Sequence, residues 1–446
     1  EGGCVKGAPS EGKPAGVAMP KQAGEIRARW PWVERAVWTD RMLAALETGV
    51  KGGKWFSLMD KVGSMKNLQR GWAVVREHKG AAGVDGQTVH RFEMRAEQEI
   101  GRLEQELRGG SYAPKGVKRV QIPKAGSRET RPLGIPAVRD RVVQTALRNV
   151  LEPIFEVRFA PTSYGFRPGR GCKDALRRVQ QLLDAGHIWV VDADIRKYFD
   201  SIPHDQLMVE VEKEVADGRV LDLLRAYLEA GIFDGMEEWT PEEGTPQGAV
   251  ISPLLANIYL HPVDLVMAAA GYEMVRYADD FVVMCRDQAE AEAALQLVRE
   301  IIEGRGLSLH PDKTRIVDAT QRGGFDFLGY HFERGYRWPR KKSMKKLKDA
   351  IRAKTKRTNG NSLTTIIESI NPTLRGWFGY FKHSHWNVFP GVDGWVRMRL
   401  RSILRKRRKG RGRGRGQDHY RWPNSFFREA GLYSMQEARA LLCRPR

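Results

Sequence analysis

The chain has little cysteine and no long apolar segment. Its four cysteines, Cys4, Cys172, Cys285 and Cys443, lie far apart and form no CxxC pair. This spacing indicates neither a zinc knuckle nor a disulfide framework, and it fits a reducing compartment. No uninterrupted apolar run approaches the ~20 residues that a membrane-spanning helix needs. The N-terminal residues are rich in Gly, Lys and Pro and lack the apolar core of a signal peptide, so we expect a cytoplasmic protein of bacterial type.

Acidic residues are scarce in one part of the chain. The net charge is +21, and residues 331–416 hold 25 Lys or Arg but only 4 Asp or Glu, so this stretch carries the whole excess. Solvated surfaces seldom concentrate charge in this way, and the pattern favours a polyanionic partner, RNA or DNA first. An anionic membrane surface is the alternative. The segment, however, interleaves aromatic residues in a folded pattern and does not form a single amphipathic helix.

Hydrophobic periodicity indicates an α+β protein without regular βαβ repeats. Residues 55–108 have a mainly helical pattern, and residues 117–123 alternate like a strand. A short apolar strand is expected at 188–195. The two apolar runs of 273–285 around a tight centre predict a hairpin. The low-complexity run 405–416 is expected to be a mobile loop.

Three aspartates are candidates for catalysis. Asp279 and Asp280 lie at the tip of the expected hairpin, and Asp194 lies near the end of the expected strand 188–195. Adjacent carboxylates between apolar runs repel each other unless a cation is present. Carboxylates that meet from separate strands can hold the two Mg²⁺ ions that serve in nucleotide joining. An ordinary Asx turn is the alternative for the pair, and by periodicity alone Asp192 could take the place of Asp194.

The motifs are more informative as an ordered set than singly. In order, the chain reads IPKAGSRETRPLGIP (122–136), SYGFRPGRG (163–171), DIRKYFDSIPH (194–204), GTPQGAVISPLLANIYL (244–260), YADD (277–280), LSLHPDKT (307–314), FDFLGYHF (325–332) and INPTLRGWFGYF (370–381). Together they resemble, in order and rough spacing, the sequence blocks of group II intron reverse transcriptases and their maturase domain. The resemblance covers about residues 55–400.

The resemblance implies an α+β right-hand polymerase with fingers and palm, followed by an α-helical thumb and maturase domain. The expected units are a partly disordered N-terminal extension (1–54), fingers and palm (55–335), the helical thumb and maturase-specific domain (336–404), and a basic Arg/Gly loop with a C-terminal tail (405–446). The implied reaction extends a DNA primer on an RNA template from deoxynucleoside triphosphates, using two Mg²⁺ ions, with Mn²⁺ as a substitute. The second implied function is binding of the intron RNA as a splicing maturase and mobility factor.

The resemblance also implies a role for each matching residue. The catalytic aspartates and metal ligands are Asp194, Asp279 and Asp280, with Ile195 as a further metal contact. Phe199 matches the bulky residue that lies under the sugar and excludes a 2′-hydroxyl. The other nucleotide contacts are Lys124 and Arg131 in the fingers, Lys197 and Tyr198 through backbone N–H groups, and Gln247 beside the new base pair. Taken alone, Lys124 and Arg131 could equally lie in a solvated loop, and Phe199 could be a core residue.

The basic segment is expected to supply the nucleic-acid contacts, because helices bearing several Lys and Arg can follow a phosphate backbone. The candidates are Lys345, Lys346, Lys348, Arg352 and Arg375. The aromatic residues Trp377, Phe378 and Phe381 are interpreted as helix packing in preference to base stacking.

Other functions on the same fold are the alternatives. One is an RNA-binding splicing factor that has lost polymerisation, but the intact aspartate triad argues against it. Another is a defence or repair polymerase, but the sequence of 370–381 favours the maturase type. Many family members continue into an HNH-type endonuclease with paired Cys and His ligands. This chain has neither, so we expect a lineage that lacks the endonuclease, or a domesticated relative that is free of an intron.

Overall fold

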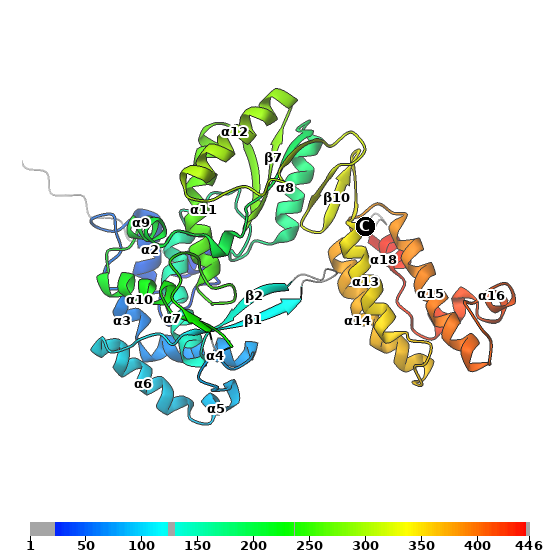
Figure 1. The fold of residues 1–446 in the computed structure, drawn as a ribbon, viewed down its shortest axis with the longest axis horizontal. Coiled ribbons are helices and arrows are strands. Elements are labelled where there is room, and N and C mark those ends of the chain that lie inside the picture. Colours follow the sequence, from blue (N-terminus) through cyan, green and yellow to red (C-terminus); the bar gives the residue numbers. More distant parts are fainter. Residues whose placement is uncertain (1–22, 124–129, 236, 443–446) are drawn as a thin grey trace, which may run out of the picture.

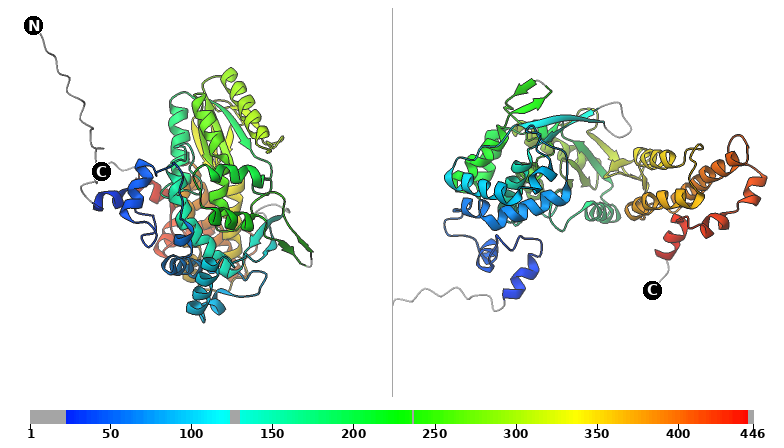
Figure 2. Two further views of the ribbon diagram at one scale, coloured as in Figure 1. Left: turned by 90° about the vertical axis from the view of Figure 1, so that its left-hand side faces the viewer. Right: turned by 90° about the horizontal axis from the view of Figure 1, so that it is seen from below.

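The computed structural model describes residues 23–123, 130–235 and 237–442. Residues up to Pro339 form an N-terminal lobe of helices and small sheets, and residues 341–442 form a C-terminal lobe of helices to its right (Figure 1). The right-hand view of Figure 2 shows the C-terminal helices extending to one side of the rest of the molecule. No helix in the described part of the chain is long and apolar enough to cross a membrane.

Helices dominate the first third of the N-terminal lobe. They are α1 (Ala23–Arg29), α2 (Asp40–Thr48), α3 (Met59–Val62), α4 (Met65–His78), α5 (Val89–Glu93), α6 (Ala96–Gly109) and α7 (Val138–Glu156). Helix α7 is buried along most of its length and packs against α4. The fully buried indole of Trp38 donates a hydrogen bond to the backbone oxygen of Asn149 at 2.9 Å, which docks the segment after α1 onto α7.

Two hairpins form a four-stranded sheet beside these helices. Its strands are β1 (Val117–Pro123), β2 (Thr130–Ile135), β4 (Ile232–Asp234) and β5 (Glu237–Trp239), in the order β2-β1-β4-β5. Strand β1 pairs antiparallel with β2 and parallel with β4. The expected strand at 117–123 is therefore confirmed, and the β4–β5 hairpin is an element that the sequence analysis missed.

A central antiparallel sheet positions the candidate aspartates. Its strands are β3 (Trp189–Asp194), β6 (Glu273–Tyr277), β7 (Asp280–Cys285) and β8 (Arg315–Asp318), in the order β6-β7-β3-β8. The surrounding helices of this region are α8 (Cys172–Asp184), α9 (His204–Glu212), α10 (Gly218–Leu228), α11 (Ser252–Ala269) and α12 (Gln288–Gly304), with a 3-10 turn at Tyr198–Asp200. Alternate residues of β3 and β7 belong to two different core clusters, so both faces of the sheet are covered. This double burial explains why these strands are nearly continuous apolar runs.

A small sheet and six helices complete the chain. The sheet consists of β9 (Phe325–Phe327), β10 (Tyr330–Glu333) and β11 (Tyr336–Pro339), and the helices are α13 (Lys341–Lys354), α14 (Leu363–Phe381), α15 (Val388–Arg407), α16 (Gln417–Arg421), α17 (Asn424–Glu429) and α18 (Met435–Leu442). Trp422, Phe427 and Met435 join the same core cluster as the buried residues of α13 to α15. The expected boundary at residue 404 therefore does not coincide with the end of this core.

The low-complexity run 405–416, expected to be a mobile loop, begins with the last three residues of helix α15, and the loop itself starts after Arg407. Helix α15 continues through Arg407, because Lys and Arg are good helix formers and the preceding Ile403 is buried in the core. Arg405 donates through Nε to the oxygen of Arg411 at 2.8 Å and also pairs with Asp418. The backbone N–H of Arg415 donates to the same Asp418 carboxylate at 2.9 Å. These contacts fix both ends of the loop.

Candidate active site

The three candidate aspartates lie together at one end of the central sheet. Asp194 is the last residue of β3 and Asp280 the first of β7, and the two are directly opposite each other in the ladder. Asp279 precedes Asp280 in the tight turn between β6 and β7. Asp192, the alternative to Asp194, lies opposite Val282, two positions farther from the turn. All four side chains are half-buried.

Burial and mutual repulsion make these carboxylates hard to ionise. The pKa of Asp280 is raised to about 7, first by burial and then by the charges of Asp192, Asp279 and Asp194. The pKa of Asp279 is also raised, first by burial and then by the charge of Asp194. Burial raises the pKa of Asp192 to about 6, although Arg315 opposes the shift. Carboxylates of this kind are stabilised when a cation binds beside them.

Two cationic side chains already contact the cluster. Lys313 Nζ lies 2.6 Å from Asp194 Oδ2, and Arg315 Nε lies 3.3 Å from Asp192 Oδ2. Both cations belong to the segment around β8, more than a hundred residues from their partners in the chain. Lys313 lies in the motif block LSLHPDKT (307–314), but sequence reasoning assigned this residue no role. Its position in LSLHPDKT was the only available signal.

The aspartates fit divalent cations by their charge and pairing, but they do not form a closed cage. In the described ranges, no three His, Cys, Asp or Glu side chains converge closely enough to hold a metal ion as they stand. The ladder nevertheless holds Asp194 opposite Asp280, and their repulsion is only partly offset. Lys313 would compete with a metal ion for Asp194 Oδ2. Ile195 follows directly, buried and bridged to Leu309.

A cavity of about 770 Å³ opens beside Asp279. The sequence-predicted residues Arg131, Phe199 and Gln247 all line it. A second cavity of about 540 Å³ is lined by Lys197, and Phe199 and Gln247 line both cavities. Lys124 lies outside the described residues.

Tyr198 and Gln247 are fixed by contacts to neighbouring elements. The Tyr198 hydroxyl is buried and donates to the backbone oxygen of Ala256 in α11 at 2.5 Å, so the ring points into the core. The backbone oxygen of Gln247 accepts from Gly134 N–H of β2 at 2.6 Å. Gly248 has φ +111°, and a Cβ there would lie 2.5 Å from the oxygen of Gly134, so only glycine allows this close approach.

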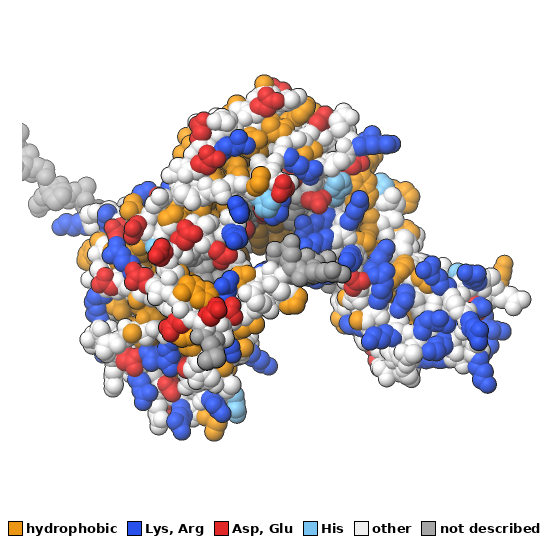
Figure 3. Space-filling model, viewed as in Figure 1, with side chains coloured by type: hydrophobic (Ala, Val, Ile, Leu, Met, Phe, Trp, Pro, Cys, Tyr) orange, Lys and Arg blue, Asp and Glu red, His pale blue; other side chains and the backbone are white. Residues whose placement is uncertain are grey.

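The expected nucleic-acid contacts lie on the C-terminal lobe. Lys345, Lys346 and Arg352 are exposed on α13, whose opposite side buries Leu347 and Ile351. Lys348 and Arg352 lie 5.9 and 5.7 Å from the centre of the Trp395 ring. Arg375 is exposed on α14, 5.3 Å from the Tyr433 ring. Figure 3 shows many Lys and Arg side chains on this face of the lobe.

The aromatic residues of α14 pack inside the protein, as the sequence analysis interpreted them. Phe378 and Phe381 are buried, and Trp377 contacts Phe381 with ring centres 4.8 Å apart. The interpretation as helix packing is therefore confirmed for these three residues.

Comparison with known proteins agrees with this geometry. Residues 122–332 match the family model described as reverse transcriptase (RNA-dependent DNA polymerase), and residues 344–422 match the group II intron, maturase-specific domain. The α+β reverse transcriptase fold that was expected is thereby confirmed. Reverse transcriptase domains use divalent metal ions and bind nucleic acid, with RNA as template.

Three curated relatives illustrate the extent of the similarity. The chain is 37% identical over 299 residues to protein YkfC of Escherichia coli, covering 57% of this chain and 77% of YkfC. It is 39% identical over 189 residues to the group II intron-encoded protein LtrA of Lactococcus lactis, covering 42% of this chain and 31% of LtrA. It is 27% identical over 231 residues to nuclear intron maturase 2 of Arabidopsis thaliana, covering 43% of this chain and 31% of that protein.

Proposed function

The chain belongs to the reverse transcriptase family of RNA-directed DNA polymerases and carries a group II intron maturase-specific domain, and from this premise we propose that it extends a DNA primer on an RNA template at Asp194, Asp279 and Asp280. The observation that carries this assignment is the pairing of Asp194 with Asp280 beside the turn that bears Asp279. Asp279 borders a cavity large enough for a nucleotide, which Phe199 and Gln247 also line.

The aspartates would hold two Mg²⁺ ions, which supply activation of the primer 3′-hydroxyl and neutralisation of the leaving pyrophosphate. The side chains that line the cavity bind and position the nucleotide. Phe199 limits the space beneath the sugar, so a 2′-hydroxyl would collide with its ring. Gln247 supports the new base pair from the turn fixed on β2. Arg131 presents a guanidinium that can pair with phosphate oxygens in two places at once.

The proposed triphosphate contacts also include main-chain groups. Lys197 has φ +46° and precedes the 3-10 turn that begins at Tyr198. The first N–H groups of such a turn have no partner within it and point away from its start. We assign Lys124 to the same triphosphate site from the resemblance of its sequence block alone.

The second proposed role is RNA binding by the C-terminal lobe, with a group II intron RNA as the partner. The maturase-specific match at 344–422 falls within the stretch that carries the whole positive excess. Exposed Lys345, Lys346 and Arg352 on α13 are the proposed phosphate contacts, with Lys348 and Arg375 beside them. The functional division proposed here places fingers and palm at 55–335 and the thumb and maturase region after it.

Primer extension by an Asp279→Ala variant tests the proposed active site. Loss of a metal ligand should lower DNA synthesis on a primed RNA template by several orders of magnitude, on the order of 10³-fold or more. Binding of the same RNA should change little, because the removed charge is negative and the basic lobe is untouched. Asp222→Asn, at an exposed position on α10, is the matched control and should extend normally. Near-normal extension by purified Asp279→Ala would refute the assignment.

A further inference from the structure

The side chain behind the catalytic turn is an arginine buried in an apolar strand. Arg276 lies in β6, three residues before Asp279, and its side chain is 1% exposed. Its Nε and Nη2 atoms donate to the two carboxylate oxygens of Asp264 in α11 at 2.7 and 2.5 Å. Burial of an ion pair carries a large desolvation cost, so such a pair contributes little to stability by itself. Its presence here calls for another explanation.

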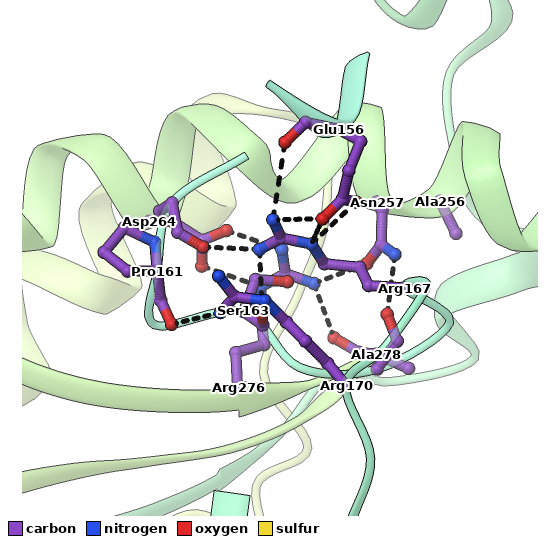
Figure 4. Close-up of polar contacts among 12 residues, drawn as sticks. Glu156, Pro161, Ser163, Arg167, Arg170, Ala256, Asn257, Asp264, Arg276 and Ala278 are labelled. Atoms are coloured by element: carbon purple, nitrogen blue, oxygen red, sulfur yellow. Dashed lines mark hydrogen bonds and ion pairs between the residues drawn. The ribbon is translucent and has the colours of Figure 1, made fainter. Parts of the chain in front are cut away.

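The remaining guanidinium nitrogen contacts the turn itself. Arg276 Nη1 donates to the backbone oxygen of Ala278 at 3.0 Å and to Asn257 Oδ1 at 3.0 Å. Figure 4 shows Asp264, Asn257 and Ala278 arranged around the Arg276 guanidinium. Ala278 is the residue between Tyr277 and Asp279, so the guanidinium holds the peptide that leads into Asp279.

The turn needs support from outside its own residues. Ala278 has φ +59°, a left-handed conformation that is unfavourable for a residue with a Cβ. The two aspartates that follow repel each other and Asp194, which disfavours any conformation that gathers them. A short turn with these two sources of strain requires surrounding structure to fix it.

A third segment packs against the same turn. Asn257 Nδ2 donates to the oxygen of Gly165 at 2.8 Å, which ties the SYGFRPG loop to α11. A Cβ on Gly165 would lie 2.3 Å from the backbone nitrogen of Ala278, so the loop lies directly against the turn. Asn257 therefore couples the loop, helix α11 and the Arg276 guanidinium in one network.

From these contacts we propose that Arg276, oriented by Asp264 and Asn257, is a positioning residue that sets the place of Asp279 and thereby the metal affinity of the site. The proposal rests on the proposed function, in which Asp279 is a metal ligand. Lysine at this position keeps the charge but cannot contact Asp264 in two places and Ala278 at once. Replacing Arg276 by Lys therefore tests whether the several directed hydrogen bonds of the guanidinium are needed, apart from its positive charge.

Direct Mn²⁺ binding and thermal unfolding separate positioning from plain stability. Arg276→Lys in the full chain should weaken Mn²⁺ binding, measured without nucleotide or nucleic acid, by about 10-fold or more, the usual effect of losing a residue that orients a metal ligand. In primer extension it should raise the half-saturating Mg²⁺ concentration and lower kcat, leaving RNA affinity unchanged.

Arg401→Lys is the matched control. Arg401 is also buried, and its guanidinium donates to the Trp422 oxygen and to Asn424 Oδ1 at 2.9 Å each, but it lies on α15 and contacts neither the turn nor the SYGFRPG loop. It should lower the unfolding temperature without weakening Mn²⁺ binding. Asn257→Ala, which keeps the Arg276–Asp264 pair, serves if Arg276→Lys does not fold and should also weaken Mn²⁺ binding.

Unchanged Mn²⁺ affinity in Arg276→Lys overturns the proposal, as does unchanged affinity in Asn257→Ala where that variant replaces it. Equal weakening of Mn²⁺ binding in Arg401→Lys also overturns it. The Mn²⁺ comparison tests the positioning role of Arg276 even if the wild-type protein extends no primer. Failure of the wild type to extend a primer would instead reject the proposed polymerase function.

Discussion

Replacing Asp280 by Asn should stabilise the metal-free protein while abolishing its activity. Burial and three neighbouring carboxylates raise the pKa of Asp280 from its ordinary value of 3.8 to about 7. Each pKa unit corresponds to about 1.4 kcal/mol, so the ionised side chain costs the native state up to about 4 kcal/mol. Asparagine has nearly the same shape and no charge. It retains part of the cost of burying a polar group, so the expected gain at pH 8 is about 2–4 kcal/mol.

The sign of the pH dependence follows from proton uptake. Between pH 4 and pH 7 the unfolded chain has lost the Asp280 proton while the native state keeps it, so wild-type stability falls as pH rises through this window. Above pH 7 both states are ionised and the penalty is constant. Asp280→Asn lacks this pH-dependent contribution to the free energy of unfolding. Its advantage over the wild type should therefore shrink by about 2 kcal/mol or more when the pH is lowered from 8 to 5.

Urea unfolding in EDTA at pH 8 and at pH 5 measures both quantities. The signal is taken from the N-terminal lobe, because the largest core clusters of the two lobes are separate, although Phe381 of α14 joins a smaller cluster with strands of the central sheet. Asp222→Asn on the exposed face of α10 controls for removal of a carboxylate elsewhere and should show no such difference. Added Mg²⁺ should stabilise the wild type and not Asp280→Asn. The reasoning fails if Asp280→Asn is no more stable than the wild type at pH 8, or if its advantage is the same at both pH values.

Two further predictions concern sugar selection and RNA binding. Phe199→Ala should raise the ratio of ribonucleotide to deoxynucleotide incorporation while template use persists, since Phe199 lines both cavities and its loss would leave room for a 2′-hydroxyl. An unchanged ratio in single-turnover assays would make Phe199 a packing residue. A quadruple change to Gln on α13 should flatten the slope of log affinity for RNA against log salt by roughly two to four units, because each lost phosphate contact contributes about 0.7–0.9. Filter binding over a salt series measures it, and an unchanged slope would place the RNA elsewhere. The four residues are Lys345, Lys346, Lys348 and Arg352.

Local patterns in the sequence were enough to predict the strands that carry the site. The apolar runs of 273–285 flank a short polar centre, and they fold as β6, a tight turn and β7. The strand expected at 188–195 is β3. In both cases burial on two faces produces a continuous apolar run, and the run is visible without knowledge of the partner strands. The β4–β5 hairpin was missed because strands of three residues are too short to show a period.

Long-range pairing could not be derived from periodicity. Asp194 meets Asp280 only because β3 and β7 are neighbours in the sheet, although 86 residues separate them in the chain. Lys313 contacts Asp194 across 119 residues for the same kind of reason. Arg276 was readable as an unusual charge in an apolar strand, but its partner on α11 depends on how the helix packs. Resemblance to a family selected Asp194 over Asp192, and spacing alone did not.

The balance of charge at the site bears on how it takes up metal ions. The carboxylates Asp192, Asp194, Asp264, Asp279 and Asp280 and the Arg276 guanidinium are buried or half-buried, and the cations Lys313 and Arg315 pair with this cluster from exposed positions. Fully ionised, five carboxylates and three cations leave a net charge of −2, which one divalent ion neutralises. A second divalent ion would give the site a net positive charge. Unpaired charge is costly at a half-buried position. A nucleoside triphosphate brings the negative charge that removes this excess.

We therefore expect one Mn²⁺ to bind tightly to the free protein and a second to bind only together with a non-hydrolysable deoxynucleotide on primed template. Titration of Mn²⁺ with and without that nucleotide measures the two stoichiometries, and two tight ions in the nucleotide-free protein would contradict this charge balance.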